Sequence, residues 1–543
     1  PTIAFNDGNR VTQEFFANFN TKVKNIGING TLGTTLRTSV GKATGAGSIN
    51  LGFSEFQSIA LRQGEPNVSV INYQTKLRRY FGRLGLDYKN MIFVEGTGSY
   101  DTDSRLAPVG SFSNSDISLF YPGVNASLVI SKMIPGLEEN KFINYIKLRG
   151  AITKTGNATP WSPYQNTPGF GVATFFPFGS TLGYLAGTTI FPAKPKPEFV
   201  KNKEVGLELG FLKNRISVEA NYYSQDNTNQ VLNVSLSNTT GYTNAKVNAG
   251  SFTNRGLELD LKLTPLVKIG QLSVDFKINY AHQTNEVTSL LDGVDQLGIG
   301  NYNYAIVGKS AFTLLMPDYK RDRTEGSATY GKVIVDRITG MPTIDPNVQE
   351  FGHTMPDDLV GLNLNLTFKG FTFGVTAEYR TGNQIVADVL GQYLDDNGIS
   401  QRSAANGRRA FVFPNSVYDD GSGKLVENSN VYTKNYGRSF YNAASNTDAI
   451  SNYVASGAFW KLREVALSYT MPSRFFKGNT IKGVTFAITG RNLLTWLPKS
   501  NVWTDPEFTG NGNNAYSGNA GGRSTGYNLP PTRIFGANVV FTF

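Results

Sequence analysis

Residues 204–223 read EVGLELGFLKNRISVEANYY, and residues 257–280 read LELDLKLTPLVKIGQLSVDFKINY. In both stretches apolar side chains alternate with charged, polar or small ones on either side of a short turn. A period of two is typical of a strand with one apolar and one polar face. The runs reach about nine residues or more, the length at which a tilted strand crosses a bilayer. The two stretches therefore predict amphipathic hairpins that are long enough to span a membrane.

The spacing of turns and long segments extends this interpretation to the whole chain. Short turns at 212–215, 265–270, 369–370 and 472–482 alternate with long excursions at 155–197, 285–356, 382–457 and 491–528. Residues 41–66 also predict a long loop, because glycine and serine interrupt the alternation. Outer-membrane barrels combine short periplasmic turns with long extracellular loops. We therefore expect an all-β chain that forms a transmembrane antiparallel β-barrel, with about 15–16 strands in this sequence.

Composition excludes several other classes of protein. The chain has 543 residues and no cysteine, which rules out disulfides, zinc–thiolate sites and thiol nucleophiles. It offers no run of about 18 apolar residues for a membrane-spanning helix. The net charge is +10, but the basic residues are scattered over turns and strand ends, and no recognition motif accompanies them. We expect no nucleic-acid partner.

The alternation assigns side chains to two faces. Leu259 and Phe276 fall on the apolar face and are expected to meet lipid, so that a charge introduced at either position should damage insertion. The polar face should form the wall of the lumen, where a change of charge at Asp260 should be tolerated. The wall residues that we predict are Glu208, Glu219, Glu258, Asp260 and Asp275.

Catalytic and metal sites have little support in the sequence. The only two histidines, His282 and His353, are expected to be polar lumen or loop residues. Without cysteine no Cys–His pair can form, so we expect no enzyme and no bound cofactor. Clustered acidic residues suit Ca²⁺, but here they lack the spacing of an EF-hand and favour turn chemistry instead. The weak Ca²⁺ candidates are Asp395, Asp396, Asp419 and Asp420.

Aromatic residues gather in two of the long excursions. Stacking on such rings would suit an extracellular vestibule for substrate; the alternatives are loop packing and an interfacial aromatic belt, which Trp496 suits best. The candidate ligand-binding residues are Trp161, Tyr164 and Phe170, with Phe175 and Phe176, in the first excursion and Trp503 and Tyr516 in the last.

Several short motifs occur in an order that resembles one known family, the SusC/RagA-type TonB-dependent outer-membrane transporters of Bacteroidetes. The resemblance covers most of the chain and rests on KEVGLE at 203–208, NRGLE at 254–258, GHTMPDDLVG at 352–361, FWKLREV at 459–465, RNLLT at 491–495 with DPE at 505–507, and PPTR at 530–533.

The resemblance implies a place for this chain in a larger protein. Members of the family carry an N-terminal plug and a TonB box before a barrel of about 22 strands. Neither is visible here, so residues 1–543 are expected to be the C-terminal portion of one barrel domain. The implied activity is active import of glycan or peptide oligomers, energised by TonB through the plug, with a SusD-like surface lipoprotein as partner. Two alternatives stay open: a structural or docking barrel in a larger envelope assembly, and a passive porin of about 16 strands.

Overall fold

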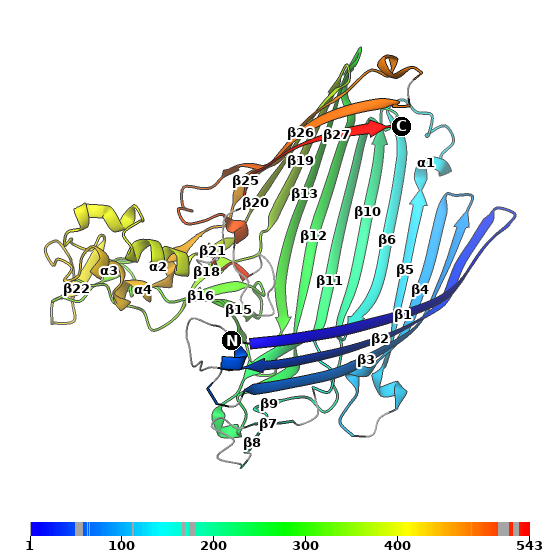
Figure 1. The fold of residues 1–543 in the computed structure, drawn as a ribbon. Helices are drawn as coiled ribbons and strands as arrows, with labels where there is room; N and C mark the ends of the chain where they lie inside the picture. The colour runs from blue at the N-terminus through cyan, green and yellow to red at the C-terminus, as the bar shows by residue number, and fades with distance from the viewer. Residues whose placement is uncertain are drawn as a thin grey trace.

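The structure is a computed structural model that describes residues 2–48, 58–61, 63–64, 66–110, 113–165, 169–172, 181, 183–478, 480–508, 521–524 and 531–543. One large sheet dominates it, curved into a wall that Figure 1 shows from the side. The sheet has 16 strands, and apart from β9 each pairs antiparallel with the strands before and after it on the path. The predicted all-β architecture and strand number are confirmed.

The strands of the wall follow chain order from β1 to β27. They are β1 Thr2–Val23, β2 Ile26–Gly47, β3 Asn67–Tyr88, β4 Ile92–Asp103, β5 Ser118–Val129, β6 Ile143–Asn157, β10 Glu198–Phe211, β11 Ile216–Ser235, β12 Asn244–Ile269, β13 Leu272–Ser289, β19 Asp358–Phe368, β20 Phe371–Thr381, β25 Phe459–Thr470, β26 Gly483–Trp496 and β27 Ile534–Thr542. β9, Thr189–Ile190, pairs parallel with β12. Among the described residues β1 and β27 do not pair with each other, and each forms an edge of the sheet (Figure 1). The full strand number of the closed barrel stays a prediction.

The hairpin that opens the sequence forms as predicted. Leu207 pairs with Ala220 and Glu208 with Glu219, and the turn residues Lys213 and Asn214 have positive φ. The hairpin between β19 and β20 turns at Lys369 and Gly370, which both have positive φ. Two consecutive residues with positive φ give a hairpin loop the twist that matches the flanking strands. Glycine adopts a positive φ without steric cost.

Two loop predictions are wrong. The predicted turn at 265–270 is mostly strand, because β12 continues to Ile269 and the register shifts between Leu263 and Val267. A bulge of this kind lets Pro265 lie within a strand although it has no N–H to donate. The predicted loop at 41–66 is strand up to Gly47, since β2 pairs along its whole length with both β1 and β3.

The outward face of the wall carries two aromatic girdles. Near the short turns, Phe368, Phe371, Tyr469 and Phe486 are in register across four strands. At the other end the matching row contains Tyr280, Val360, Tyr379, Trp460 and Trp496. The rings of Tyr379 and Trp460 stack with centroids 4.7 Å apart. Apolar residues lie between the girdles, as expected for a surface that meets lipid.

A separate lobe extends from one end of the wall (Figure 1, green through yellow to ochre). It is built from the excursions between β13 and β19 and between β20 and β25, and two buried clusters hold it together, one around Leu314, Met316 and Val386 and one around Tyr319, Val333 and Val335. Its strands are β14 Gln296–Gly300, β15 Asn303–Ile306, β16 Thr313–Met316, β17 Val333–Ile334, β18 Gln349–His353, β21 Gln384–Val386, β22 Ser416–Asp419, β23 Leu425–Glu427 and β24 Val454–Ser456.

Helices are few and short. The α-helices are α1 Ile130–Met133, α2 Asp388–Asp396, α3 Arg438–Tyr441 and α4 Ala444–Thr447. The 3₁₀ segments are η1 Ile59–Leu61, η2 Ser104–Leu106, η3 Asn114–Ile117, η4 Asn238–Thr240, η5 Arg402–Arg408, η6 Ile450–Tyr453, η7 Ser473–Phe476 and η8 Pro506–Phe508. In the described part of the chain, no helix is long and apolar enough to cross a membrane. The excursion between β6 and β10 adds the small strands β7 Phe170–Val172 and β8 Tyr184–Ala186.

Candidate functional site

The inward face of the wall is polar and laced with ion pairs. Lys147, Glu208, Glu219, Asp260 and Asn279 form one row in register across β6, β10, β11, β12 and β13. The Lys147 ammonium lies 2.9 Å from Glu208, and Arg149 reaches both Glu208 at 3.3 Å and Glu219 at 2.7 Å. Basic groups thus compensate Glu208 and Glu219, and the apolar residues between the members of the row point to the other face.

All five predicted wall acids lie on this polar face. Glu208, Glu219 and Asp260 belong to the row just described, and Asn279 donates a hydrogen bond to Asp260. Glu258 accepts a hydrogen bond from Asn221. Asp275 pairs in register with Asn365 on β19.

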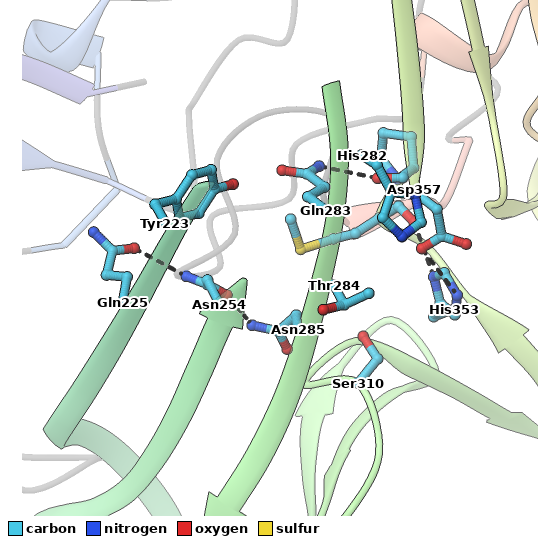
Figure 2. Close-up of a pocket in the computed structure, with 12 residues that line it drawn as sticks. Tyr223, Gln225, Asn254, His282, Gln283, Thr284, Asn285, Ser310, His353 and Asp357 are labelled. Atoms are coloured by element: carbon cyan, nitrogen blue, oxygen red, sulfur yellow. Dashed lines mark hydrogen bonds and ion pairs between the residues drawn. The ribbon is translucent and has the colours of Figure 1, made fainter. Parts of the chain in front are cut away.

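A pocket of about 500 Å³ opens at the lobe end of the wall, between β11, β12, β13 and residues 353–357 (Figure 2). Carboxamides line one side of it. Gln225, Asn254 and Asn285 are opposite one another on three adjacent strands. Hydrogen bonds between neighbouring carboxamides connect the three side chains. Asn254 Nδ2 donates to Gln225 Oε1 at 3.1 Å, Asn285 Nδ2 donates to Asn254 Oδ1 at 2.5 Å, and the Ala311 N–H donates to Asn285 Oδ1 at 2.7 Å. We call these three residues the carboxamide ladder.

Glycine shapes the wall beside the ladder. Tyr223 pairs with Gly256, and its ring lies so close to that strand that a Cβ on Gly256 would come within 2.5 Å of it. Only glycine lets the ring lie flat against the strand and present its hydroxyl edge to the pocket. This close approach gives a physical reason for the glycine in the NRGLE motif at 254–258.

Both histidines border the same pocket, on the side away from the ladder (Figure 2), although the His282 side chain lies on the face of β13 that carries Tyr280. His282 Nδ1 lies 2.9 Å from Asp358 Oδ1. His353 Nε2 lies 3.6 Å from Asp357, and its Nδ1 lies 2.8 Å from the Met355 carbonyl oxygen. Burial raises the pKa of Asp357 above its usual range; the nearby Asp358 carboxylate adds to the rise, and His353 and His282 oppose it.

The chemistry available in the pocket is recognition by hydrogen bonds. Amide, hydroxyl and imidazole groups both donate and accept, which suits the hydroxyls of a sugar or the peptide groups of an oligopeptide. Within the described ranges, no three His, Cys, Asp or Glu side chains are placed to hold a metal ion together. Gln283 is already engaged, because its Nε2 donates to the Pro356 carbonyl oxygen at 2.9 Å and fixes the segment that closes the pocket.

A buried ion-pair network fixes the last excursion to the inward face. Lys461, which is 3% exposed, donates to Asp505 at 2.8 Å and to Glu507. Arg463 joins Glu507 to Glu378, with N–O distances of 2.5 Å and 2.6 Å. Burial would raise the pKa of Glu507, but the hydrogen bonds from Arg463 and Lys461 outweigh it and lower that pKa to about 2. The DPE motif at 505–507 thus anchors a loop to the wall.

The aromatic residues predicted to bind a ligand differ in how exposed their rings are. Trp161 is 2% exposed: it packs with Leu106 and Ile117 and donates its Nε1–H to the Lys196 carbonyl oxygen, so its ring is not available to a ligand. Trp503 is half-buried and stacks with the Arg402 guanidinium, 4.6 Å from its ring centre. Tyr164 and Phe170 are 63% and 73% exposed. The other three candidates, Phe175, Phe176 and Tyr516, lie outside the described residues.

The predicted Ca²⁺ candidates are occupied by other partners. Asp395 lies fully buried at the end of α2, where Arg402 Nε is 3.0 and 2.9 Å from its two carboxylate oxygens and a second guanidinium nitrogen also donates to it. Asp396 pairs with Arg438 at 2.9 Å. Asp419 and Asp420 accept hydrogen bonds from backbone N–H groups of residues 421–423, as acidic side chains do in turns.

The sequence alone did not single out the carboxamide ladder or the Lys461–Glu507 network. Part of the signal was present, since Asn254 and the GHTMPDD and DPE segments belong to motifs that we quoted without a role. What was missing is the register, which brings Gln225, Asn254 and Asn285 side by side although they are far apart in the chain.

Comparison with known proteins gives a consistent picture. A family model described as TonB dependent receptor-like, beta-barrel, matches residues 2–334. The chain is 25% identical over 513 residues to the TonB-dependent receptor P26 of Formosa agariphila, covering 90% of this chain and 48% of that protein. It is 24% identical over 459 residues to the TonB-dependent receptor SusC of Bacteroides thetaiotaomicron, covering 80% and 42%. The chain thus spans about half the length of these curated relatives.

The fold has a match among solved structures. The structure of the RagAB peptide transporter superposes with a TM-score of 0.74 at 16% identity, over 100% of this chain and 56% of the other. The RagAB peptide importer in its "closed-closed" state gives a TM-score of 0.73 at 17% identity. At this level of identity the likeness concerns the fold.

Proposed function

Because the chain belongs to the family of TonB-dependent receptor-like β-barrels, we propose that it forms the C-terminal wall of an active importer of oligomeric nutrients in the bacterial outer membrane. As a barrel of this family, of the SusC/RagA type, it is an outer-membrane protein and not an enzyme. The observation that carries the proposal is the polar inward wall, which leads from the carboxamide ladder at the lobe end to the short turns at the other end.

The size and chemistry of the pocket favour oligomers over ions or small metabolites. A cavity of about 500 Å³ that is open to the lumen accommodates one unit of a longer chain, and neutral donors and acceptors suit glycans or peptides. Transport would draw its energy from TonB acting on a plug domain of the full-length protein. Such a plug would fill the lumen against the polar wall.

We also propose a SusD-like lipoprotein as the partner on the extracellular side. The lobe supports this proposal because it has buried clusters of its own and projects from the wall rather than folding into it (Figure 1). A rigid platform beside the mouth of the barrel suits a lid that must dock and release. Co-purification of the full-length protein with such a lipoprotein would support this pairing.

Uptake by cells tests the proposal. In cells that carry the full-length protein, uptake of a fluorescent oligosaccharide or oligopeptide should stop when TonB is deleted. The double variant Gln225→Ala/Asn285→Ala should reduce uptake at an unchanged protein level. Asn365→Ala removes a carboxamide of the same wall far from the pocket and serves as control. Uptake that persists without TonB would instead identify a passive porin, and no uptake of any oligomer would favour a structural barrel.

A further inference from the structure

A second pocket, of about 760 Å³, lies on the inward face of β1–β3 and has a different chemistry. Three arginines line it with a single carboxylate: Arg10, Arg37 and Arg105 with Asp103. Asp103 is already satisfied within the chain, because Arg105 binds it at 2.6 Å and 3.0 Å. The remaining cations are left to face the cavity.

Register places the two other arginines together. Arg10 on β1 is opposite Ser39 on β2, and Arg37 precedes Ser39 by two residues, so both guanidinium groups are on the same face. Positions related in this way across two strands are diagonal neighbours within reach of long side chains. One anionic group could therefore be held by both forks.

These two arginines differ from the others along the inward face. Arg79 binds Asp101, Arg83 binds Glu95, Arg149 binds Glu208 and Glu219, and Arg491 binds Glu464. Across the described part of the chain, no carboxylate forms an ion pair with Arg10 or Arg37. The wall therefore neutralises its other inward arginines but leaves these two forks open toward the cavity.

Tyrosine rings complete the pocket. Tyr73 lies over Gly41, where a Cβ would come within 2.2 Å of its ring, so it projects on the face that carries Arg37 and Ser39. Tyr164, at the other side of the pocket, is 63% exposed and has a φ of +60°, a conformation that a bulky residue adopts only where its surroundings hold it. Flat exposed rings beside open guanidinium forks suit a ring-shaped ligand unit that carries a negative charge.

We propose that this pocket is a binding site for the acidic groups of an anionic oligosaccharide. Arg10 and Arg37 would bind the anionic group, and the sugar rings would stack on Tyr73 and Tyr164. The proposal rests on the function proposed above and narrows its substrate class. Arginine forks bind carboxylate and sulfate groups in the same bidentate manner, so the acidic group is a carboxylate or a sulfate, and the test below distinguishes the two.

The test is titration of the purified full-length protein with four defined probes: a galacturonate tetramer, a sulfated tetrasaccharide of the carrageenan type, neutral maltotetraose and tetraglutamate. At least one acidic saccharide should bind more tightly than maltotetraose. Arg37→Gln and Arg10→Gln should each weaken that binding by about tenfold to a hundredfold, as expected for loss of a charged hydrogen bond. Arg491→Gln, which alters an inward arginine that is paired with Glu464, should leave it unchanged. Comparing the two acidic saccharides identifies the charged group.

Three results would overturn the proposal. Tighter binding of tetraglutamate than of either acidic saccharide would assign the pocket to acidic peptides. If Arg10→Gln, Arg37→Gln and Arg491→Gln lowered the affinity for the acidic saccharide equally, the effect would come from the overall charge of the wall and not from this pocket. A lower unfolding temperature for Arg10→Gln or Arg37→Gln, with unchanged affinity for the acidic saccharide, would mean that an acid from elsewhere in the protein occupies the forks. All of these are binding results, so they are separate from a failure of TonB-dependent uptake.

Discussion

His282 and Asp358 join neighbouring strands at the lobe end of the wall, with Nδ1 of the imidazole 2.9 Å from a carboxylate oxygen. The same oxygen accepts the hydroxyl of Tyr280 at 2.7 Å. Asp358 is thus held by two side chains of β13, directly beside the segment that closes the carboxamide pocket. The contact fixes the point where the chain leaves the lobe and re-enters the wall.

The substitution Asp358→Asn should weaken the hydrogen bonds to His282 and Tyr280 and so destabilise this contact. The amide accepts weaker hydrogen bonds than the carboxylate, and at a half-exposed site we expect a loss of about 1 kcal/mol in the free energy of unfolding. Urea unfolding of the full-length protein in lipid would measure it. Asp275→Asn, on the same strand pair but near the short turns, is the matched control; an equal loss for both variants would contradict a special role for Asp358.

The closing segment 353–357 should respond to pH through Asp357. Because burial raises the pKa of this carboxyl, its protonated form is favoured in the folded segment. Stability from this group is therefore complete below the usual carboxyl range and is lost as pH rises through the raised value. A spin label on Met355→Cys should be less mobile at pH 4 than at pH 7, and Asp357→Asn should reduce that difference. Unchanged pH dependence in Asp357→Asn would assign the effect to another group.

The anchor of the last excursion should show the opposite dependence. The pKa of Glu507 is lowered to about 2, so its contribution is present above the usual carboxyl value and is lost as pH falls toward 2. Glu507→Ala leaves Lys461 and Arg463 without this partner and should cost about 3–5 kcal/mol, as for other broken buried pairs.

A spin label at the exposed Val502 reports on this anchor. It should stay immobile at pH 5, become mobile near pH 2, and be mobile at all pH values in Glu507→Ala. Glu464→Gln, which breaks the more exposed pair with Arg491, should change little. A label that is equally immobile in Glu507→Ala would show that the network does not anchor the loop.

The cost in folding free energy of placing a charged residue on the outward face should depend on how deep that position lies in the bilayer. Phe276 is in register with Leu364, midway between the girdle residues Phe368 and Val360, whereas Leu259 is in the girdle row itself. Phe276→Arg should cost about 2–4 kcal/mol and Leu259→Arg about 1 kcal/mol or less, because the penalty falls from the bilayer midplane to its interfaces. Asp260→Asn should be neutral. Unfolding from lipid bilayers measures all three, and a larger cost at Asp260 would mean that the faces are inverted.

Much of the wall was predictable because strand faces repeat with a period of two. The pairs Leu207–Ala220 and Glu208–Glu219 follow from the alternation and the short turn between them. Long strands of small residues were not predictable: Gly41–Gly47 has no alternation of its own, and its strand structure depends on backbone hydrogen bonds to β1 and β3. The bulge that keeps Pro265 within β12 is likewise a property of pairing rather than of local sequence.

The sites were less predictable than the wall. An exposed-looking aromatic in a loop, such as Trp161, can form the core of that loop once Leu106 and Ile117 fold against it. Acidic pairs that resemble Ca²⁺ ligands can be neutralised from a distance in the chain, as Arg402 does for Asp395. Both outcomes depend on contacts between excursions, which neither periodicity nor motif spacing reports.

Cysteine labelling measures the two faces of the wall most directly, because the chain contains no cysteine of its own. Single cysteines would replace residues 258–263 in turn in the full-length protein, in cells, and be exposed to a charged, membrane-impermeant maleimide. Labelling should alternate, with positions 258, 260 and 262 reactive from the lumen and positions 259, 261 and 263 protected by lipid. Uniform labelling, or reaction at 259, 261 and 263 alone, would contradict a membrane wall whose polar face lines the transport path.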